Sequence, residues 1–161
     1  LHHFKAVADL LQTKVQTTLK QGGLVLINEY AGPNRLQYPK AQIRAINEAL
    51  QLIPGAYRHR FKTDILKRRV SGPGLWRMIL ADPSECVDSE SIIPALHRHF
   101  EVVEERPYGG NLLMLALKDI AHHFIDTHPE SERVLERLFA AEDAYLENHE
   151  SDFIYGVYRK N

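Results

Sequence analysis

The chain has 161 residues, of which 44% are hydrophobic and 25% are charged, and its formal net charge is -1 at pH 7. A charge so close to zero gives no overall field that would attract nucleic acid or an anionic membrane, so neither is an expected partner. The single cysteine, Cys86, excludes an internal disulfide, and no apolar run is long enough for a membrane span or a signal peptide. We therefore expect one cytoplasmic domain spanning residues 1–161.

The first predicted element is a helix over residues 4–19. Lys20 complements the helix dipole in the last turn, and Gly22 or Gly23 can adopt the left-handed conformation that ends a helix. The apolar residues of this helix recur at helical spacing and form a single stripe that must be buried: Phe4, Val7, Ala8, Leu11, Val15 and Leu19.

The run of residues 24–27 that follows is apolar without interruption, which is typical of a parallel strand covered by helices on both faces. Asn28, Glu29 and Tyr30 stand at its far end. Ligands of open α/β sheets collect outside the carboxyl ends of the strands, so these three residues form the first candidate site. Ordinary loop and turn chemistry is the alternative interpretation.

Residues 31–80 show little strand pattern and are expected to form a helical insertion or cap. The basic stretch 57–69 is expected to be a solvated helix rather than a phosphate- or nucleic-acid-binding patch, because Asp64 interrupts its charges. Trp76 fits either an acceptor pocket or the core. A helix that ends at Pro54-Gly55 carries a one-sided set of apolar residues: Ile43, Ile46, Leu50 and Ile53.

The rest of the sequence returns to an α/β pattern. Asp88 or Ser89 can cap the first helix of this part, and Thr127 with Glu130 resembles a capping box between its last two helices. The patterns of apolar and β-forming residues predict a helix over 92–100, a strand over 101–106, helices over 112–124 and 135–146, and a strand over 153–158.

Nine histidines raise the question of a metal site. His2-His3 and His122-His123 are adjacent pairs, and adjacent side chains on a helix diverge by about 100°, so neither pair is expected to bind a metal. There is no Gly-x-Ser-x-Gly elbow of a serine hydrolase. Cys86 is expected to be a small buried or half-buried residue rather than a reactive thiol.

Several segments carry a resemblance to a known family. Leu1-His2-His3 precedes a helix, and the turn at residues 19–23 precedes an apolar strand. Further segments are residues 28–35, Asp82-Pro83-Ser84-Glu85 and residues 108–113. Together they resemble a bacterial subgroup of class I S-adenosylmethionine-dependent methyltransferases, over nearly the whole chain. Gln21 departs from the family pattern, which has proline at that position.

The resemblance implies an α/β fold that is the C-terminal part of a Rossmann-like methyltransferase sheet. One parallel strand would lie at 24–27, and a C-terminal strand pair would end in the antiparallel strand 153–158, with large helical insertions at 31–80 and 108–150. The family's glycine-rich loop and acidic residue, which hold the cofactor, have no counterpart in this sequence. We therefore expect the cofactor-binding N-terminal half to be missing from this chain, which alone should not be a competent enzyme.

The implied activity is methyl transfer from S-adenosylmethionine to a small-molecule or glycan acceptor. The expected cofactor-binding residues are Leu1, His2 and His3. The expected catalytic residues are His3 and Glu29, with His2 or His3 as the base and Glu29 orienting the acceptor. Arg35 is suited to an anionic group of the acceptor. The expected acceptor-binding residues are Asn28, Tyr30, Arg35, Tyr38, Trp76 and Tyr108.

A non-catalytic α/β interaction module is the alternative. Such a fragment would use exposed apolar helix faces to self-associate, as a homodimer, or to pair with a partner chain. A glycine-rich loop roughly 100 residues upstream would favour the enzyme, on the spacing of such α/β units. The absence of that loop would favour the module.

Overall fold

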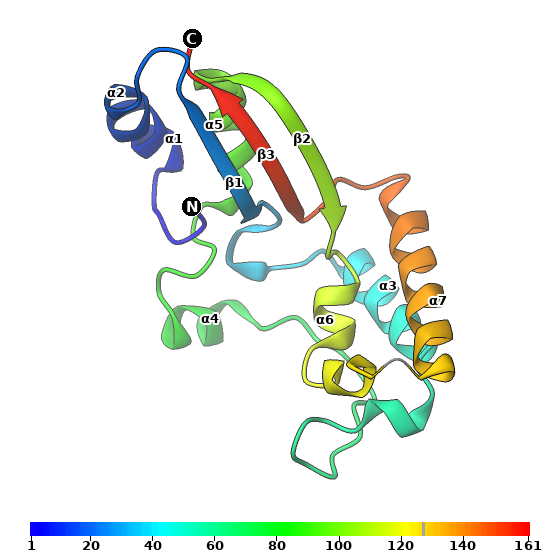
Figure 1. Ribbon diagram of the computed structural model, residues 1–161. Coiled ribbons are helices and arrows are strands. Elements are labelled where there is room, and N and C mark those ends of the chain that lie inside the picture. Colours follow the sequence, from blue (N-terminus) through cyan, green and yellow to red (C-terminus); the bar gives the residue numbers. More distant parts are fainter. Residues whose placement is uncertain (127) are drawn as a thin grey trace. The chain divides into compact units, whose positions relative to one another are not determined.

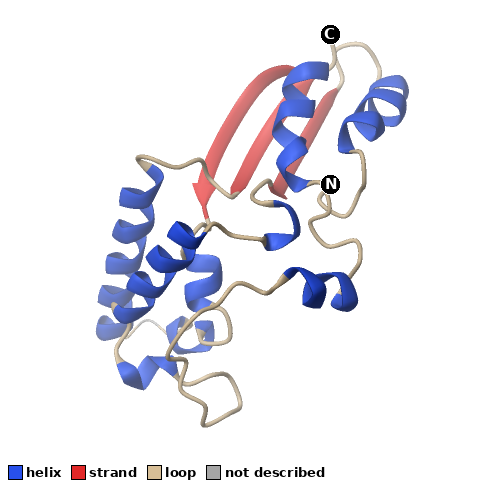
Figure 2. Ribbon diagram, turned by 180° about the vertical axis from the view of Figure 1, so that it is seen from behind, coloured by secondary structure: helices blue, strands red, loops and turns tan. Residues whose placement is uncertain are grey.

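The computed structural model describes residues 1–126 and 128–161, which form two compact units (Figures 1 and 2). The first unit comprises residues 1–37, 73–108 and 151–161, and the second comprises residues 38–72 and 109–150. A single domain over residues 1–161 stays a prediction. Within the part of the chain that the structure describes, no helix is long and apolar enough to cross a bilayer.

The first unit combines helices with a sheet. Its strands are β1 (Leu24–Tyr30), β2 (Glu101–Gly109) and β3 (Phe153–Arg159). Its helical segments are α1 (Val7–Leu10), the π-helical η1 (Leu11–Val15), α2 (Gln16–Thr18), the 3-10 segment η2 (Asn34–Leu36), α4 (Leu75–Ala81), the 3-10 segment η4 (Ser89–Ser91) and α5 (Ile92–His99). The expected helix over 4–19, helix over 92–100 and strands over 101–106 and 153–158 are confirmed, with shifted ends.

The sheet is antiparallel and has the strand order β1-β3-β2. β1 pairs with β3 from Leu24 opposite Arg159 to Tyr30 opposite Phe153. In Figure 1 the arrowheads of β1 and β2 point the same way, and that of β3 points the opposite way. The expected parallel pairing of residues 24–27 does not occur among the described strands, because β3 is the strand beside β1.

Helices cover one face of this sheet. Figure 2, the view from behind, shows α5 across the sheet, and α1 packs beside α5. Burial therefore alternates along β1: Ile27 is 7% exposed, whereas Leu26 is 62% exposed. The expectation that helices bury the run 24–27 on both faces is wrong for this chain. The core beneath the covered face is formed by Val7, Leu11, Ile27, Ile92, Ala95, Leu96, Phe100, Ile154 and Tyr158.

The start of α1 is capped by a residue distant in sequence. Asp88 accepts hydrogen bonds from the backbone N–H of Val7 (2.9 Å) and from the hydroxyl of Ser91 (2.6 Å). The sequence pattern had assigned Asp88 or Ser89 to the start of α5, but η4 intervenes there and α5 has no side-chain cap. Asp88 instead ties the first helix to the segment that leads into α5.

The second unit is helical. Its segments are α3 (Lys40–Gln51), the 3-10 segment η3 (Gly55–Arg58), α6 (Leu113–Leu117), the 3-10 segment η5 (Ala121–Phe124) and α7 (Pro129–Leu146). Thr127 of the expected capping box lies outside the described residues, and the residue that caps α7 is His128, whose Nδ1 accepts from Glu130 N–H at 3.4 Å. The core of this unit is formed by Ile46, Ala49, Leu50, Ile53, Val70, Leu112, Ala116, Ile120, Val134 and Leu138.

Buried charges hold both ends of the short helix α6. At its start, the Glu142 carboxylate accepts the backbone N–H groups of Asn111 (2.8 Å), Leu112 (2.9 Å) and Leu113 (2.9 Å). The backbone at residue 109 passes so close to Glu142 that a Cβ there would lie 2.8 Å from the carboxylate, so only glycine fits. Gly109 also has φ +88°, a conformation that favours glycine. At the other end, the Lys67 ammonium donates to the carbonyls of residues 115, 116 and 118 at 2.6, 3.0 and 2.6 Å.

This role of Lys67 explains why the expected helix over 57–69 does not form. Beyond η3 the segment is a loop closed by a bridge between His59 and Leu66. Its backbone is also tied to the end of α6, since Phe61 N–H donates to the Asp119 carbonyl at 2.7 Å. Tertiary contacts thus override the local helical pattern. The expected helix over 112–124 is interrupted between α6 and η5, where the contacts with Lys67 and Phe61 lie. Asp119 in this interruption adopts φ +66°.

Candidate functional site

Three segments of the first unit meet at the carboxyl end of β1. The turn before α1 carries two histidines, β1 contributes Glu29, and the loop after α4 contributes Asp82 and Glu85. A backbone hydrogen bond from Val87 N–H to the His2 carbonyl (3.1 Å) holds that loop against the turn. We name the five ionisable residues gathered here the β1-end cluster: His2, His3, Glu29, Asp82 and Glu85.

The shortest contact of the cluster joins His2 to Glu29. Nδ1 of His2 lies 2.6 Å from Oε2 of Glu29, and the amino group of Leu1 also donates to this carboxylate. Burial raises the pKa of Glu29, but the hydrogen bonds from Leu1 and His2 outweigh it and hold this pKa below its ordinary value. Glu29 is therefore ionised at neutral pH, and Nδ1 of His2 is the donor. In the neutral form of His2, Nε2 is then the nitrogen that carries the lone pair.

His3 faces the loop after α4. Its Nδ1 lies 3.0 Å from the Ser84 hydroxyl and 4.0 Å from an Asp82 oxygen, and its Nε2 lies 3.7 Å from Oε2 of Glu85. Asp82 is held by the hydroxyl and backbone N–H of Ser84 at 2.7 and 2.8 Å. These two hydrogen bonds lower the pKa of Asp82. The imidazoles of His2 and His3 lie with ring centroids 4.4 Å apart.

Arg35 lies beside the same loop. Its backbone adopts φ +57°, and its N–H donates to the Cys86 carbonyl at 2.6 Å. Its guanidinium donates to the backbone carbonyls of Asp82 and Glu85, both at 3.4 Å. The expected anion-binding residue is thus beside the cluster, where its side chain braces the loop that carries two of the carboxylates.

Asn28 and Tyr108 form a second contact near the end of β1. The Tyr108 hydroxyl donates to Oδ1 of Asn28 at 2.5 Å, across the sheet from β2 to β1. The Tyr108 ring lies beside Phe153 with centroids 5.9 Å apart, and 53% of the residue is exposed. Two expected acceptor-binding residues that are 80 positions apart therefore meet on the uncovered face of the sheet.

The other expected acceptor-binding residues lie elsewhere. Tyr30 is 4% exposed, and its hydroxyl donates to the Pro33 carbonyl at 3.1 Å, so it serves the packing of the unit. Tyr38 is buried in the second unit. Trp76 is 77% exposed on α4, so it does not belong to the core, and its role in acceptor binding stays a prediction.

Asp82, Ser84 and Glu85 are site residues that the sequence did not single out. They form part of one of the segments that carried the family resemblance, which was the only sequence signal for them. Their neighbour Cys86 is 1% exposed, as expected for a buried cysteine, and burial raises the pKa of its thiol. A reactive thiolate is therefore disfavoured at this position.

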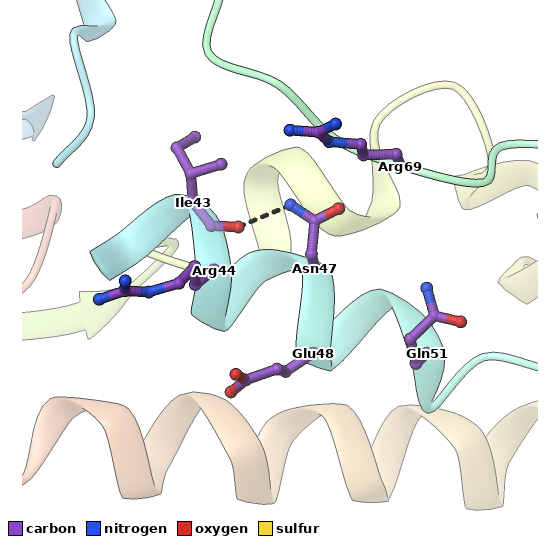
Figure 3. Close-up of a pocket in the computed structure, with 6 residues that line it drawn as sticks. All are labelled: Ile43, Arg44, Asn47, Glu48, Gln51 and Arg69. Atoms are coloured by element: carbon purple, nitrogen blue, oxygen red, sulfur yellow. Dashed lines mark hydrogen bonds between the residues drawn. The ribbon is translucent and has the colours of Figure 1, made fainter. Parts of the chain in front are cut away.

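A shallow cavity lies in the second unit, on the surface of α3 (Figure 3). Its Asn47 amide donates to the Ile43 carbonyl at 2.7 Å and to the Val70 carbonyl at 2.9 Å, so this side chain braces the backbone. The charged side chains of Arg44 and Glu48 both extend from α3 toward the left of the view in Figure 3. None of the expected site residues lines this cavity.

Comparison of the chain with family models, with curated proteins and with solved structures finds no significant match. The β1-end cluster therefore rests on its own geometry: two imidazoles and three carboxylates at the end of a strand.

Proposed function

We propose that this chain is the C-terminal, acceptor-binding part of a bacterial, cytoplasmic S-adenosylmethionine-dependent methyltransferase. The acceptor is a small molecule or a glycan. The β1-end cluster is its reaction site, and the half that binds most of the cofactor is a separate, preceding part of the protein.

The observation that carries this proposal is the contact between His2 and Glu29. These residues belong to two separate segments of the family resemblance, 27 positions apart, and their side chains approach to 2.6 Å. The resemblance placed the histidine pair beside the cofactor, and the position of Glu29 at the end of the predicted strand made it a candidate for orienting the acceptor. A carboxylate that fixes the tautomer of a histidine is also a recurrent arrangement for a general base.

The strand arrangement also supports the proposal. In the resembled family the final strand is antiparallel to its neighbours, and β3 here lies antiparallel beside β1. The outer edge of β1 and the exposed Leu24 and Leu26 are then the surface on which further parallel strands and helices of a Rossmann-like sheet would pack.

The residues of this chain do not fit the whole cofactor. Gly22 has φ +72° with open space around it, and a Cβ on Gly23 would lie 2.7 Å from the Leu19 side chain, so both glycines serve the turn after α2. Gly74, with φ +77°, directly precedes α4, but α4 has only seven residues and no described strand leads into it, so this turn lacks the strand, loop and helix of a cofactor cradle. The methionine and ribose parts must be held by residues outside this chain.

The chain's own residues supply proton transfer and orientation. S-adenosylmethionine, when bound, supplies an electrophilic methyl group. An acceptor hydroxyl or amine must lose a proton as it is methylated, and Nε2 of His2 is the nitrogen free to take it. Glu29 stabilises the imidazolium that results. Asn28 and Tyr108 offer an amide and a hydroxyl that can orient a polar acceptor.

Calorimetric titration with S-adenosylmethionine tests the proposal. We expect binding by a longer chain that begins at the natural start of the protein, and none by residues 1–161 alone. Replacing Glu29 with Gln in the longer chain should leave cofactor binding in place and reduce methyl transfer by roughly 100-fold, the scale of general base catalysis. Absence of binding by the longer chain would overturn the proposal.

The uncovered sheet face favours the interaction module as a second candidate. Leu26 is 62% exposed on the edge strand β1, and Val102 of β2 is 44% exposed. Such a face favours association with another chain or with a second copy as a homodimer. If the module is correct, the longer chain fails to bind the cofactor, while residues 1–161 sediment as a dimer that a Leu26→Asp substitution dissociates.

A further inference from the structure

We propose that His2, His3 and Glu85 bind a divalent transition-metal cation, with Zn²⁺ as the best match to their chemistry. Among the described residues these three form the one group of metal-ligating side chains whose ligand atoms all lie within 4.8 Å of one another. Two imidazoles and a carboxylate are a recurrent ligand set for Zn²⁺ and its neighbours in the transition series.

The histidine pair is suited to this role because it does not lie on a helix. The sequence argument against a metal assumed helical geometry, in which adjacent side chains diverge. His2 and His3 instead occupy a turn before α1, where their rings tilt toward each other with centroids 4.4 Å apart. A turn can therefore direct both imidazoles to one point.

The spacing between His3 and Glu85 fits an ion better than a hydrogen bond. Nε2 of His3 and Oε2 of Glu85 are 3.7 Å apart, which is too long for a hydrogen bond. Two ligand atoms at Zn²⁺ bonding distance and a tetrahedral angle are separated by about 3.4 Å. A small adjustment of either side chain would bring both atoms to that separation.

The surroundings already orient the imidazoles as metal ligands. Nδ1 of His2 is engaged by Glu29 at 2.6 Å, and Nδ1 of His3 is engaged by the Ser84 hydroxyl at 3.0 Å. Each histidine is thereby left with Nε2 for a ligand. A metal-bound histidine usually has such a partner on its second nitrogen, most often a carboxylate or another oxygen.

The charge of the cluster also favours a cation. Glu29, Asp82 and Glu85 bring three carboxylates to the two imidazoles. Arg35 is the basic side chain beside this loop, and its guanidinium is directed to the carbonyls of Asp82 and Glu85. The carboxylates are thus left to neutralise a dication.

Metal binding has a consequence for catalysis that rests on the proposed function. Nε2 of His2 cannot hold an ion and accept a proton at the same time. Zn²⁺ is therefore expected to inhibit methyl transfer in the longer chain. Uptake of the ion itself does not depend on that function, and it is measured directly.

The test is titration of the tag-free chain with Co²⁺, followed by its absorption spectrum, and competition with Zn²⁺ followed by calorimetry. We expect uptake of one ion per chain. His3→Asn and Glu85→Gln should each weaken binding at least tenfold. Glu29→Gln, which changes the partner of His2, should weaken it by roughly 10- to 100-fold. Circular dichroism establishes that each variant is folded.

The second histidine pair of the chain provides a matched control. His122 and His123 are also adjacent, with ring centroids 3.9 Å apart, but Nε2 of His123 faces the His59 carbonyl at 2.9 Å and they belong to no group of three ligands among the described residues. The double variant His122→Asn, His123→Asn should bind Co²⁺ as tightly as the parent chain. Equal weakening in this control would overturn the proposal.

The terminal amino group of Leu1 must be separated from the side-chain ligands, because it lies on Glu29 and is itself a possible ligand. Binding should persist when this group is acetylated or when residues precede Leu1. Binding that is lost on acetylation, or that is unchanged in His3→Asn and Glu85→Gln, would overturn the proposal. If the longer chain takes up the ion but does not bind the cofactor, the metal-site proposal is supported and the methyltransferase proposal is wrong.

Discussion

The chain uses charged side chains in two different ways. At the two ends of α6, Glu142 is 3% exposed and Lys67 is 4% exposed, and each charge meets three backbone groups of opposite polarity. In the β1-end cluster, half-exposed imidazoles and carboxylates meet one another. The charges of Glu142 and Lys67 are fully used by backbone groups, so their role is structural. The side chains of the β1-end cluster are partly exposed to water and contact one another, so a ligand can still reach them.

The largest effect on stability is expected from Glu142→Ala. It removes the carboxylate that accepts from the backbone N–H groups of Asn111, Leu112 and Leu113, at a cost of about 3–5 kcal/mol in the free energy of unfolding. Urea denaturation measures this loss. Glu136→Ala on the exposed side of the same helix is the control and should cost under about 0.5 kcal/mol. Equal losses would contradict the distinction between the two kinds of charge.

Lys67→Met should have the next largest effect. The substitution keeps the length of the side chain but removes the donor to three carbonyls, at a cost of about 1–3 kcal/mol. Arg68→Met, which changes the exposed neighbouring residue, is the matched control for thermal unfolding at pH 7. A loss in the control as large as that in Lys67→Met would show that burial of the ammonium has no special role.

Lys67 also predicts a dependence on pH. Burial lowers its pKa to about 8 in the folded chain from 10.5. Between these two pH values the unfolded chain binds more protons than the folded chain, so this group makes stability rise with pH. The parent chain should therefore gain stability relative to Lys67→Met between about pH 8 and pH 10. A constant difference in denaturation midpoints over this range would refute the effect.

Glu29→Gln should cost less stability, about 1 kcal/mol, because the carboxylate is near the surface. The lowered pKa of Glu29 fixes the sign of its pH dependence. Its contribution is present above the unfolded pKa of about 4.5 and disappears as the pH falls through the lower folded value. Parent and variant should then converge in acid, which thermal unfolding at several pH values below 5 can check.

The smallest effect is expected from Trp76→Ala. The indole is 77% exposed on α4, so its removal should change the free energy of unfolding by under about 0.5 kcal/mol. Urea denaturation followed by circular dichroism measures this change without the tryptophan signal. A loss above about 2 kcal/mol would instead assign Trp76 to the core, the interpretation that the sequence left open.

Periodicity predicted the elements that pack through one apolar face. The helix at 92–99 and the strand at 153–159 follow from residues spaced by four and from β-forming residues. The stretch 57–69 could not be predicted in this way, because Lys67 is directed to carbonyls 48 to 51 positions further along the chain. A basic residue that caps a distant helix has the same local pattern as one on a solvated helix.

The candidate site was predictable only in part. The resemblance pointed to His2, His3 and Glu29, but it gave no reason to add Asp82 or Glu85. Those residues join the cluster through the loop that Val87 attaches to the backbone of His2. A contact of this kind leaves no periodic pattern in the sequence. The turn that brings the rings of His2 and His3 together could not be predicted either, because the sequence pattern was interpreted as a helix.

The charges that hold α6 have a consequence for the order of folding. A helix of five residues is not stable alone in water, because its few hydrogen bonds do not offset the free energy needed to nucleate a helix. Its two anchors come from 31 and 48 positions away along the chain. We therefore expect α6 to form after α7 and the segment around Lys67 are in place, so that mutations in α6 accelerate unfolding and leave the refolding rate nearly unchanged.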